Sequence, residues 1–168
     1  ISIQFPLPMN KILPIIVVAQ FLSTSLWFAG NAVLPDIITA FDLPASFLAH
    51  ITSAVQFGFI SGTLLFAIFT IADRFSPSKV FFASSVFAAI LNLGVLLPGN
   101  ESAGILFFRF ATGFFLAGIY PVGMKIASDY FQKGLGKSLG LLVGALVLGT
   151  AFPHLLKNFT SHLPWKLV

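Results

Sequence analysis

The stretch from Ile12 to Pro35, ILPIIVVAQFLSTSLWFAGNAVLP, contains no charged side chain. An α-helix needs about 20 mainly apolar residues to cross a hydrocarbon core about 30 Å thick, so this stretch is long enough to span a membrane. Its apolar residues do not alternate with polar ones, as they would in a strand of a membrane barrel. The stretch therefore predicts a transmembrane helix.

Similar stretches recur along the rest of the chain. Uncharged runs extend over 43–72, 80–100 and 138–156, and the stretch 103–126 is equally long but carries Arg109 and Lys125. We predict five transmembrane helices, at about 12–35, 47–72, 79–98, 103–127 and 138–156.

The overall composition agrees with a membrane protein. Hydrophobic residues make up 57% of the sequence and charged residues only 8%, and the mean hydropathy is +0.99. Soluble domains carry about a quarter charged residues. We therefore expect an all-α membrane protein.

The chain closes on LPWKLV, in which Trp165 and Lys166 are residue types that anchor helices at membrane interfaces. A sixth span is therefore expected after residue 168, and residues 1–168 are interpreted as a partial N-terminal transmembrane bundle.

The positive charges lie mainly in alternate connections between the predicted helices. Cytoplasmic loops carry an excess of Lys and Arg, so this bias predicts a cytoplasmic N-terminus. Lys157 and Lys166 run against the trend. The net charge of +4 follows from the bias, and we expect no nucleic acid partner. The positive group is Lys11, Arg74, Lys79, Lys125, Lys133 and Lys137, whereas the opposite connections hold Asp36, Asp42 and Glu101.

No pattern typical of an enzyme is present. The sequence has no nucleophile elbow, no phosphate-cradling glycine loop and no pair of His ligands at i and i+4. We expect no enzymatic activity, no catalytic residue, no cofactor and no metal site.

Two predicted helices carry polar stripes. Gln20, Thr24, Trp27 and Asn31 recur at i, i+4, i+7 and i+11, and a similar spacing relates Arg109, Thr112, Leu116 and Tyr120. Polar stripes avoid lipid, so the two helices are predicted to face one cavity. The alternative is that the polar groups form hydrogen bonds between helices. The candidate substrate-cavity residues are Gln20, Trp27, Asn31, Arg109, Thr112 and Tyr120.

Arg109 is the one permanent charge set well inside a hydrophobic stretch. A charge at that depth costs roughly 2.5–3.5 kcal/mol on insertion scales, which marks it as a functional candidate. Its planar donor fork suits the oxygens of an anionic solute. Alternatively, it is a structural cation capped by backbone carbonyls or by a polar side chain. No Asp or Glu lies at its depth in these five helices.

The connection AIFTIADRFSPSKVFF (67–82) places Asp73 at the C-terminal end of the second predicted helix. The helix macrodipole is negative there, so an acid implies a compensating partner. Arg74 and Lys79 are the local candidates, and Ser76 with Pro77 is a suitable start for the third helix. The alternative is a charged tight turn with no further role.

Glycines at i and i+4 permit close helix approach. Such pairs occur in the second predicted helix, at Gly58 and Gly62, and in the fifth, at Gly140 and Gly144. We assign them to helix packing.

The chain resembles the major facilitator superfamily of secondary transporters. Ile71, Ala72, Asp73 and Arg74 are in register with its loop signature, whereas Phe69 and Ser76 replace its glycines and Pro77 and Ser78 its basic pair. Two further motifs match the superfamily. One is Arg109 with Gly113, and the other is AGNAVLPDI (29–37). We also assign Gly113 to helix packing.

This resemblance implies the first five helices of a six-helix N-terminal bundle, within a twelve-helix fold. It also implies alternating access, with gating by Asp73, Arg74 and Lys79. The fifth span lacks the Gly-Pro pair of drug antiporters, and the narrower likeness is to cyanate and nitrate or nitrite carriers.

We expect a secondary active transporter for a small solute, either an organic or an inorganic anion. Its expected partners are the solute, the lipid bilayer and the missing C-terminal half, and its expected location is a prokaryotic inner membrane. The alternatives are a non-transporting membrane scaffold or assembly subunit and an inactive truncated half-transporter.

Overall fold

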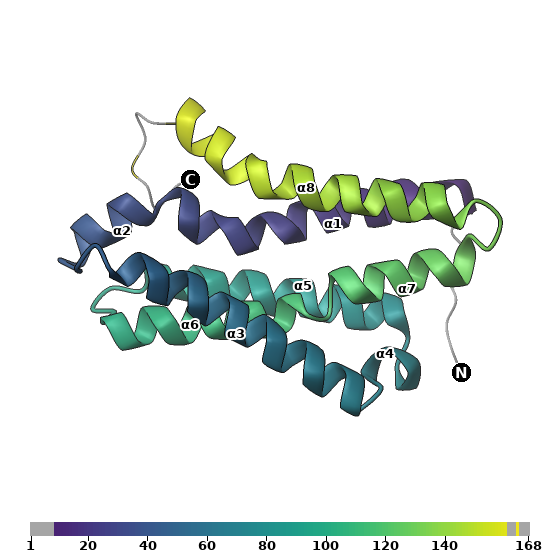
Figure 1. The fold of residues 1–168 in the computed structure, drawn as a ribbon, viewed down its shortest axis with the longest axis horizontal. Helices are drawn as coiled ribbons and strands as arrows, with labels where there is room; N and C mark the ends of the chain where they lie inside the picture. Colours follow the sequence, from purple (N-terminus) through teal and green to yellow (C-terminus); the bar gives the residue numbers. More distant parts are fainter. Residues whose placement is uncertain (1–8, 161–163, 165–168) are drawn as a thin grey trace.

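The computed structural model describes residues 9–160 and 164, and it shows a bundle of long helices that run up and down (Figure 1). Short elements connect them: α2 (Leu34–Ala40), α4 (Ile71–Arg74) and the 3₁₀ helix η1 (Gly94–Leu96). The long helices are α1 (Met9–Ala32), α3 (Phe47–Ile68), α5 (Pro77–Leu93), α6 (Ser102–Leu116), α7 (Tyr120–Tyr130) and α8 (Leu135–Phe159).

Five segments within the described residues are long and apolar enough to cross a membrane, with α6 and α7 counted as one. The prediction of an all-helical protein with five membrane-length helices is therefore confirmed. Trp165 and Lys166 lie outside the described residues, and the sixth span stays a prediction. The five segments are Lys11–Ala32, Phe47–Ile68, Pro77–Leu96, Ser102–Tyr130 and Leu135–Phe159.

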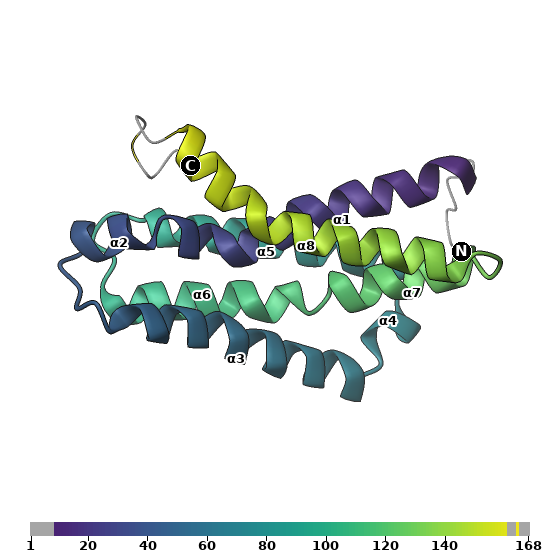
Figure 2. The same ribbon diagram turned by 45° about the horizontal axis from the view of Figure 1, so that its top comes forward.

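Two helix pairs form the bundle. α3 packs along α6, α1 packs along α8, and α5 lies against α6 behind them (Figures 1 and 2). The α3–α6 contact depends on glycine. A Cβ on Gly58 would overlap the carbonyl oxygen of Phe110, and one on Gly113 would overlap that of Val55. Gly62 meets the Phe114 carbonyl in the same way. These glycines let the two backbones approach closely.

In α8, a different glycine faces the neighbouring helix. Gly149 is buried against the backbone of Phe21 and the side chain of Thr24 on α1. Gly140 and Gly144 are exposed, and no atom of another described helix lies within 4 Å of a Cβ placed on either. Within the described residues, therefore, no contact with another helix supports the predicted packing role of Gly140 and Gly144.

The fourth predicted span is not one continuous helix. α6 ends at Leu116, a turn follows, and α7 begins at Tyr120. Pro121 lies in the first turn of α7, where its missing N–H costs no helical hydrogen bond. The first predicted span is also divided near its end, because α1 ends at Ala32 and the short α2 begins at Leu34, with Pro35 in its first turn.

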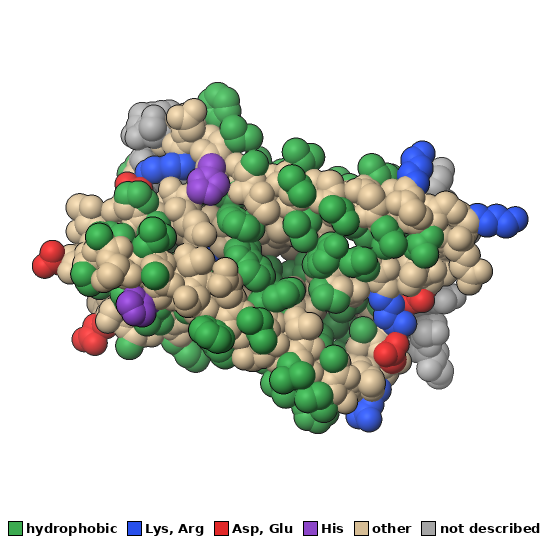
Figure 3. Space-filling view, viewed as in Figure 1, with side chains coloured by type: hydrophobic (Ala, Val, Ile, Leu, Met, Phe, Trp, Pro, Cys, Tyr) green, Lys and Arg blue, Asp and Glu red, His purple; other side chains and the backbone are tan. Residues whose placement is uncertain are grey.

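Charge and apolar surface are separated along the bundle. Figure 3 shows most of the visible Lys and Arg side chains at one end, whereas acidic side chains are visible at both ends. The long sides carry exposed apolar residues such as Phe57 on α3 and Phe82 on α5. This surface suits contact with lipid. Which end faces the cytoplasm stays a prediction.

Candidate solute site

A small cavity lies where α1, α3, α8 and the break between α6 and α7 meet, and Figure 3 shows that face hollowed between the α1–α8 pair and α3. Its volume is about 60 Å³, which is room for several waters, since one needs roughly 10–15 Å³. The lining residues are Gln20, Thr24, Trp27, Phe59, Leu116, Ile119, Tyr120 and Leu146.

Three of the six predicted cavity residues meet here: Gln20, Trp27 and Tyr120. Gln20 and Trp27 are two turns apart on one face of α1, which is why their spacing predicted a shared surface. Tyr120 is the first residue of α7, and Ile119 immediately precedes it. The break in the fourth span therefore lies at the cavity wall.

Gln20 is the most buried polar group of this wall. Its side chain is 0% exposed, and its Nε2 donates a hydrogen bond to Thr24 Oγ1 at 2.8 Å. Its Oε1 has no hydrogen-bond partner among the described residues. That oxygen lies 3.0 Å from where a Cβ on Gly123, in α7, would be. A buried acceptor without a partner is unfavourable and calls for an explanation.

Part of the cavity wall is aromatic. The rings of Trp27 on α1 and Phe59 on α3 meet edge to face, with their centroids 5.0 Å apart. Edge-to-face aromatic pairs contribute about 0.5–1.5 kcal/mol beyond the area they bury. This pair joins two helices that otherwise make few contacts.

Arg109 does not line the cavity. It is 1% exposed, and it donates hydrogen bonds to the carbonyls of Leu26, at 3.3 Å, and Trp27 on α1. Its Nη1 also donates to Oδ1 of Asn92 on α5, at 2.9 Å. Gly30 leaves room for the guanidinium, because a Cβ there would lie 2.9 Å from Cζ. This arrangement favours the structural alternative, a cation capped by carbonyls and a polar side chain.

The other two predicted cavity residues, Thr112 and Asn31, are also absent from the cavity lining. Thr112 is fully buried and donates to the Phe108 carbonyl of its own helix at 2.7 Å. Asn31 has a buried Oδ1 with no hydrogen-bond partner among the described residues. Asn92, by contrast, was not singled out from the sequence, because a single Asn in an apolar run carries no pattern.

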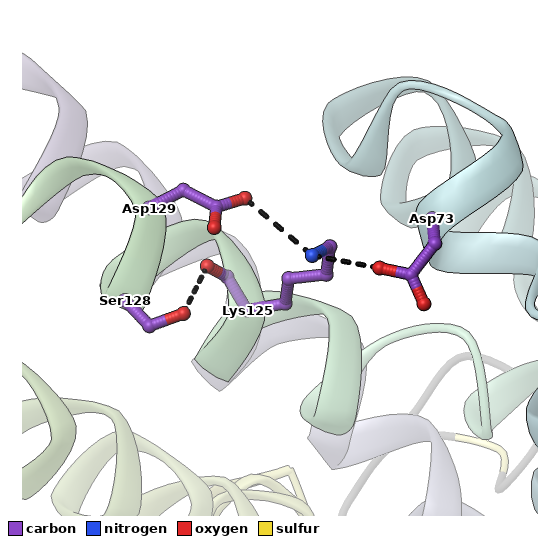
Figure 4. Close-up of polar contacts among 4 residues, drawn as sticks. All are labelled: Asp73, Lys125, Ser128 and Asp129. Carbon is purple, nitrogen blue, oxygen red and sulfur yellow. Dashed lines mark hydrogen bonds and ion pairs between the residues drawn. The ribbon is translucent and has the colours of Figure 1, made fainter.

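The partner of Asp73 is Lys125 on α7 (Figure 4). Nζ of Lys125 lies 2.9 Å from Oδ1 of Asp73 and 3.9 Å from Oδ2 of Asp129. The suggestion that Arg74 or Lys79 compensates Asp73 was therefore wrong, since neither forms an ion pair with it in the described residues. Spacing along the chain could not reveal a partner on another helix.

The helix of the third predicted span, α5, starts at the residues that its sequence predicts. Ser76 occupies the N-cap position and Pro77 opens α5. The Ser76 side chain, however, makes no capping hydrogen bond.

A second ion pair lies at the opposite end of the bundle. Nζ of Lys157, near the end of α8, is 2.8 Å from Oδ2 of Asp36 on α2. Both side chains are about two-thirds buried, with 27% and 31% exposed. Lys157 departs from the charge bias along the chain, and the adjacent carboxylate compensates it at this end.

Comparison with known proteins assigns the family. The model of the Major Facilitator Superfamily matches residues 16–168, so the chain belongs to this superfamily and is a multi-pass membrane protein. The family consists of transporters, which agrees with the expectation that the chain is not an enzyme.

The similar curated proteins are plant phosphate transporters. The chain is 30% identical over 110 residues to the probable inorganic phosphate transporter 1-2 of Arabidopsis thaliana, which covers 61% of this chain and 20% of that protein. It is equally similar to inorganic phosphate transporter 1-1 of Arabidopsis thaliana, with the same coverage. It is 28% identical over 134 residues, 77% of this chain and 23% of that protein, to low affinity inorganic phosphate transporter 3 of Petunia hybrida.

The chain thus spans about a fifth of the length of these relatives. No solved structure matches it. The relatives are phosphate transporters and not cyanate or nitrate carriers, so the narrower resemblance is not supported. Because they are plant proteins, they give no support to a prokaryotic inner membrane either.

Proposed function

We propose that this chain forms part of a secondary transporter that moves a small inorganic oxyanion, with phosphate as the first candidate, by alternating access. The observation that carries the proposal is the convergence of Gln20, Trp27 and Tyr120 on one cavity inside the bundle. The phosphate transporters among the relatives supply the candidate solute.

The chemistry of the cavity suits a small anion. Ile119 and Tyr120, at the start of α7, belong to its wall. A helix N-terminus carries partial positive charge, and broken helices of transporters direct such ends toward anionic groups of their solutes. Tyr120 adds a phenolic hydroxyl and Trp27 an indole N–H, both of which can donate hydrogen bonds to oxyanion oxygens.

The proposed path lies between this bundle and a second half-bundle of the whole transporter. Rocking of two half-bundles around a fixed site opens it to each side in turn. The Asp73–Lys125 ion pair ties the loop after α3 to α7, which begins at the cavity. We infer that Asp73, with Arg74 beside it on α4 and Lys79 in the first turn of α5, biases this motion.

The test is anion uptake by the full-length protein in liposomes, with phosphate, nitrate, cyanate and sulfate offered separately. We expect phosphate uptake, and we expect Trp27→Leu to reduce it at least about tenfold, as for loss of a well-placed binding group. Phe57→Leu, at a 63% exposed position on α3, is the matched control and leaves uptake unchanged. A folded protein that takes up none of these anions under any imposed gradient overturns the proposal.

A further inference from the structure

Gln20 holds an unused hydrogen-bond acceptor inside the cavity wall. Its Oε1 has no partner among the described residues, although the side chain is 0% exposed. We propose that Gln20 is a specificity-determining residue whose carbonyl oxygen accepts a hydrogen bond from the solute. The solute must then carry a donor, so the site selects a protonated oxyanion, such as phosphate bearing a hydroxyl, over a bare one such as sulfate.

This inference rests on the proposed function and specifies which oxyanions the cavity accepts. Its first step is the orientation of the carboxamide. Nε2 of Gln20 donates to Thr24 Oγ1 at 2.8 Å, which directs the amide end toward Thr24 and leaves the carbonyl oxygen without a hydrogen bond. A carbonyl oxygen can only accept hydrogen bonds.

The second step is the room left for that oxygen. It lies 3.0 Å from the position of a Cβ on Gly123, close to the start of α7. A side chain at residue 123 would press on the oxygen, whereas glycine leaves it in place. The acceptor is therefore held against α7 at Gly123, three residues after Tyr120, which lines the cavity.

The third step is the charge of the cavity wall. Among the described residues, its lining contains no Lys, Arg, His, Asp or Glu. The nearby cations already have other partners. Arg109 donates hydrogen bonds to a carbonyl of α1 and to Asn92, and Lys125 forms an ion pair with Asp73. The wall thus offers neutral donors together with one buried acceptor.

These groups discriminate between oxyanions by hydrogen bonding. Sulfate has no hydroxyl and would place only lone pairs against Gln20 Oε1. The Gln20 oxygen and the sulfate oxygen beside it would then both lack a hydrogen-bond donor. A hydroxyl of protonated phosphate donates to that oxygen, while its other oxygens accept from Tyr120 and Trp27. A site built to pair with a solute hydroxyl rejects an analogue that lacks it, because the buried polar group of the site is then left without a partner.

The experiment measures uptake of labelled phosphate by the full-length protein in liposomes, with unlabelled competitors. It is run at a pH at which phosphate and methylphosphonate each carry a hydroxyl. We expect methylphosphonate to compete and sulfate to compete at least about tenfold more weakly. In Gln20→Leu, we expect the affinity for phosphate to fall. We also expect the ratio of phosphate affinity to sulfate affinity to decrease at least about tenfold.

Two further variants keep the result interpretable. Thr24→Val removes the partner of Nε2, which frees the amide to turn toward the solute, so sulfate competes better than in the wild type. Ser25→Ala on the same helix, where the hydroxyl bonds the Leu22 carbonyl, leaves the selectivity unchanged.

The outcomes separate the two proposals. Phosphate uptake that sulfate inhibits as well as methylphosphonate does, or unchanged selectivity in both Gln20→Leu and Thr24→Val, overturns the role of Gln20 alone. Absence of phosphate uptake by the folded wild-type protein overturns the proposed function and this inference with it.

Discussion

Nη1 of Arg109 on α6 lies 2.9 Å from Oδ1 of Asn92 on α5. The same guanidinium also bonds two carbonyls of α1, so one side chain joins three helices. A charge inside a membrane is costly unless its donors are satisfied. Here neutral acceptors bond both Nη atoms, which explains how these terminal nitrogens are held without an acid at their own depth, whereas the buried Nε has no hydrogen-bond partner among the described residues.

The first prediction concerns this cap. Arg109→Lys keeps the charge but loses the planar fork that reaches acceptors on two helices, so we expect a less stable protein. The melting temperature of the purified full-length protein in detergent should fall by at least about 4 °C. Lys79→Arg, an exposed exchange between the same two residue types, is the control. A melting temperature equal to the wild type would contradict the structural role of Arg109.

The second prediction concerns the contact between α3 and α6. Gly58→Ala introduces a Cβ that overlaps the Phe110 carbonyl oxygen, so the two backbones must separate. We expect a destabilisation of roughly 1–3 kcal/mol, measured by thermal or denaturant unfolding in detergent. Gly136→Ala is matched to it, since no described atom lies within 4 Å of a Cβ at that position. Equal stability of the two variants would show that the close approach is absent.

The third prediction concerns the ion pair between Asp73 and Lys125. If this pair biases the gating motion, Asp73→Asn and Lys125→Gln each change the uptake rate, and the double variant changes it no more than either one alone. Lys133→Gln serves as a comparison, because Lys133 is exposed and forms no ion pair among the described residues. Effects that simply add in the double variant would mean that the two residues act independently.

The fourth prediction concerns Asp36 and Lys157 at the other end of the bundle. Asp36→Asn leaves a partly buried Lys without its partner, which is more costly than removing both charges. We therefore expect less folded protein in the membrane for Asp36→Asn than for Asp36→Asn combined with Lys157→Gln. Quantifying the folded protein extracted from membranes checks this. The pairing would be refuted if the double variant accumulated no better than the single one.

Sequence alone located the helices and part of the site, because both depend on local pattern. Long uncharged runs mark the membrane segments, and helical spacing placed Gln20 and Trp27 on one face. Spacing does not tell which neighbouring helix that face meets, so Arg109 was grouped with the cavity although it bonds Asn92. The pairing of Asp73 with Lys125 depends on the tertiary arrangement for the same reason.

The break before Tyr120 did leave a signal in the sequence. Pro121 disfavours helical geometry at the residue before it, and the run AGIYP (117–121) fits a helix end followed by a new start. The strong hydrophobicity of the whole segment outweighed that signal, and the segment was predicted as one span.

We propose that solute occupies the cavity between α1, α3, α8 and the α6–α7 break. The most direct test uses Leu146→Cys, on the α8 side of the cavity, in full-length protein with no other cysteine. None of the 168 residues here is Cys. We expect a water-soluble thiol reagent to label this site, phosphate to slow the labelling, and Lys133→Cys, at an exposed position between α7 and α8, to show no such protection. Labelling of Leu146→Cys that saturating phosphate leaves unchanged, in protein that still transports phosphate, would contradict it.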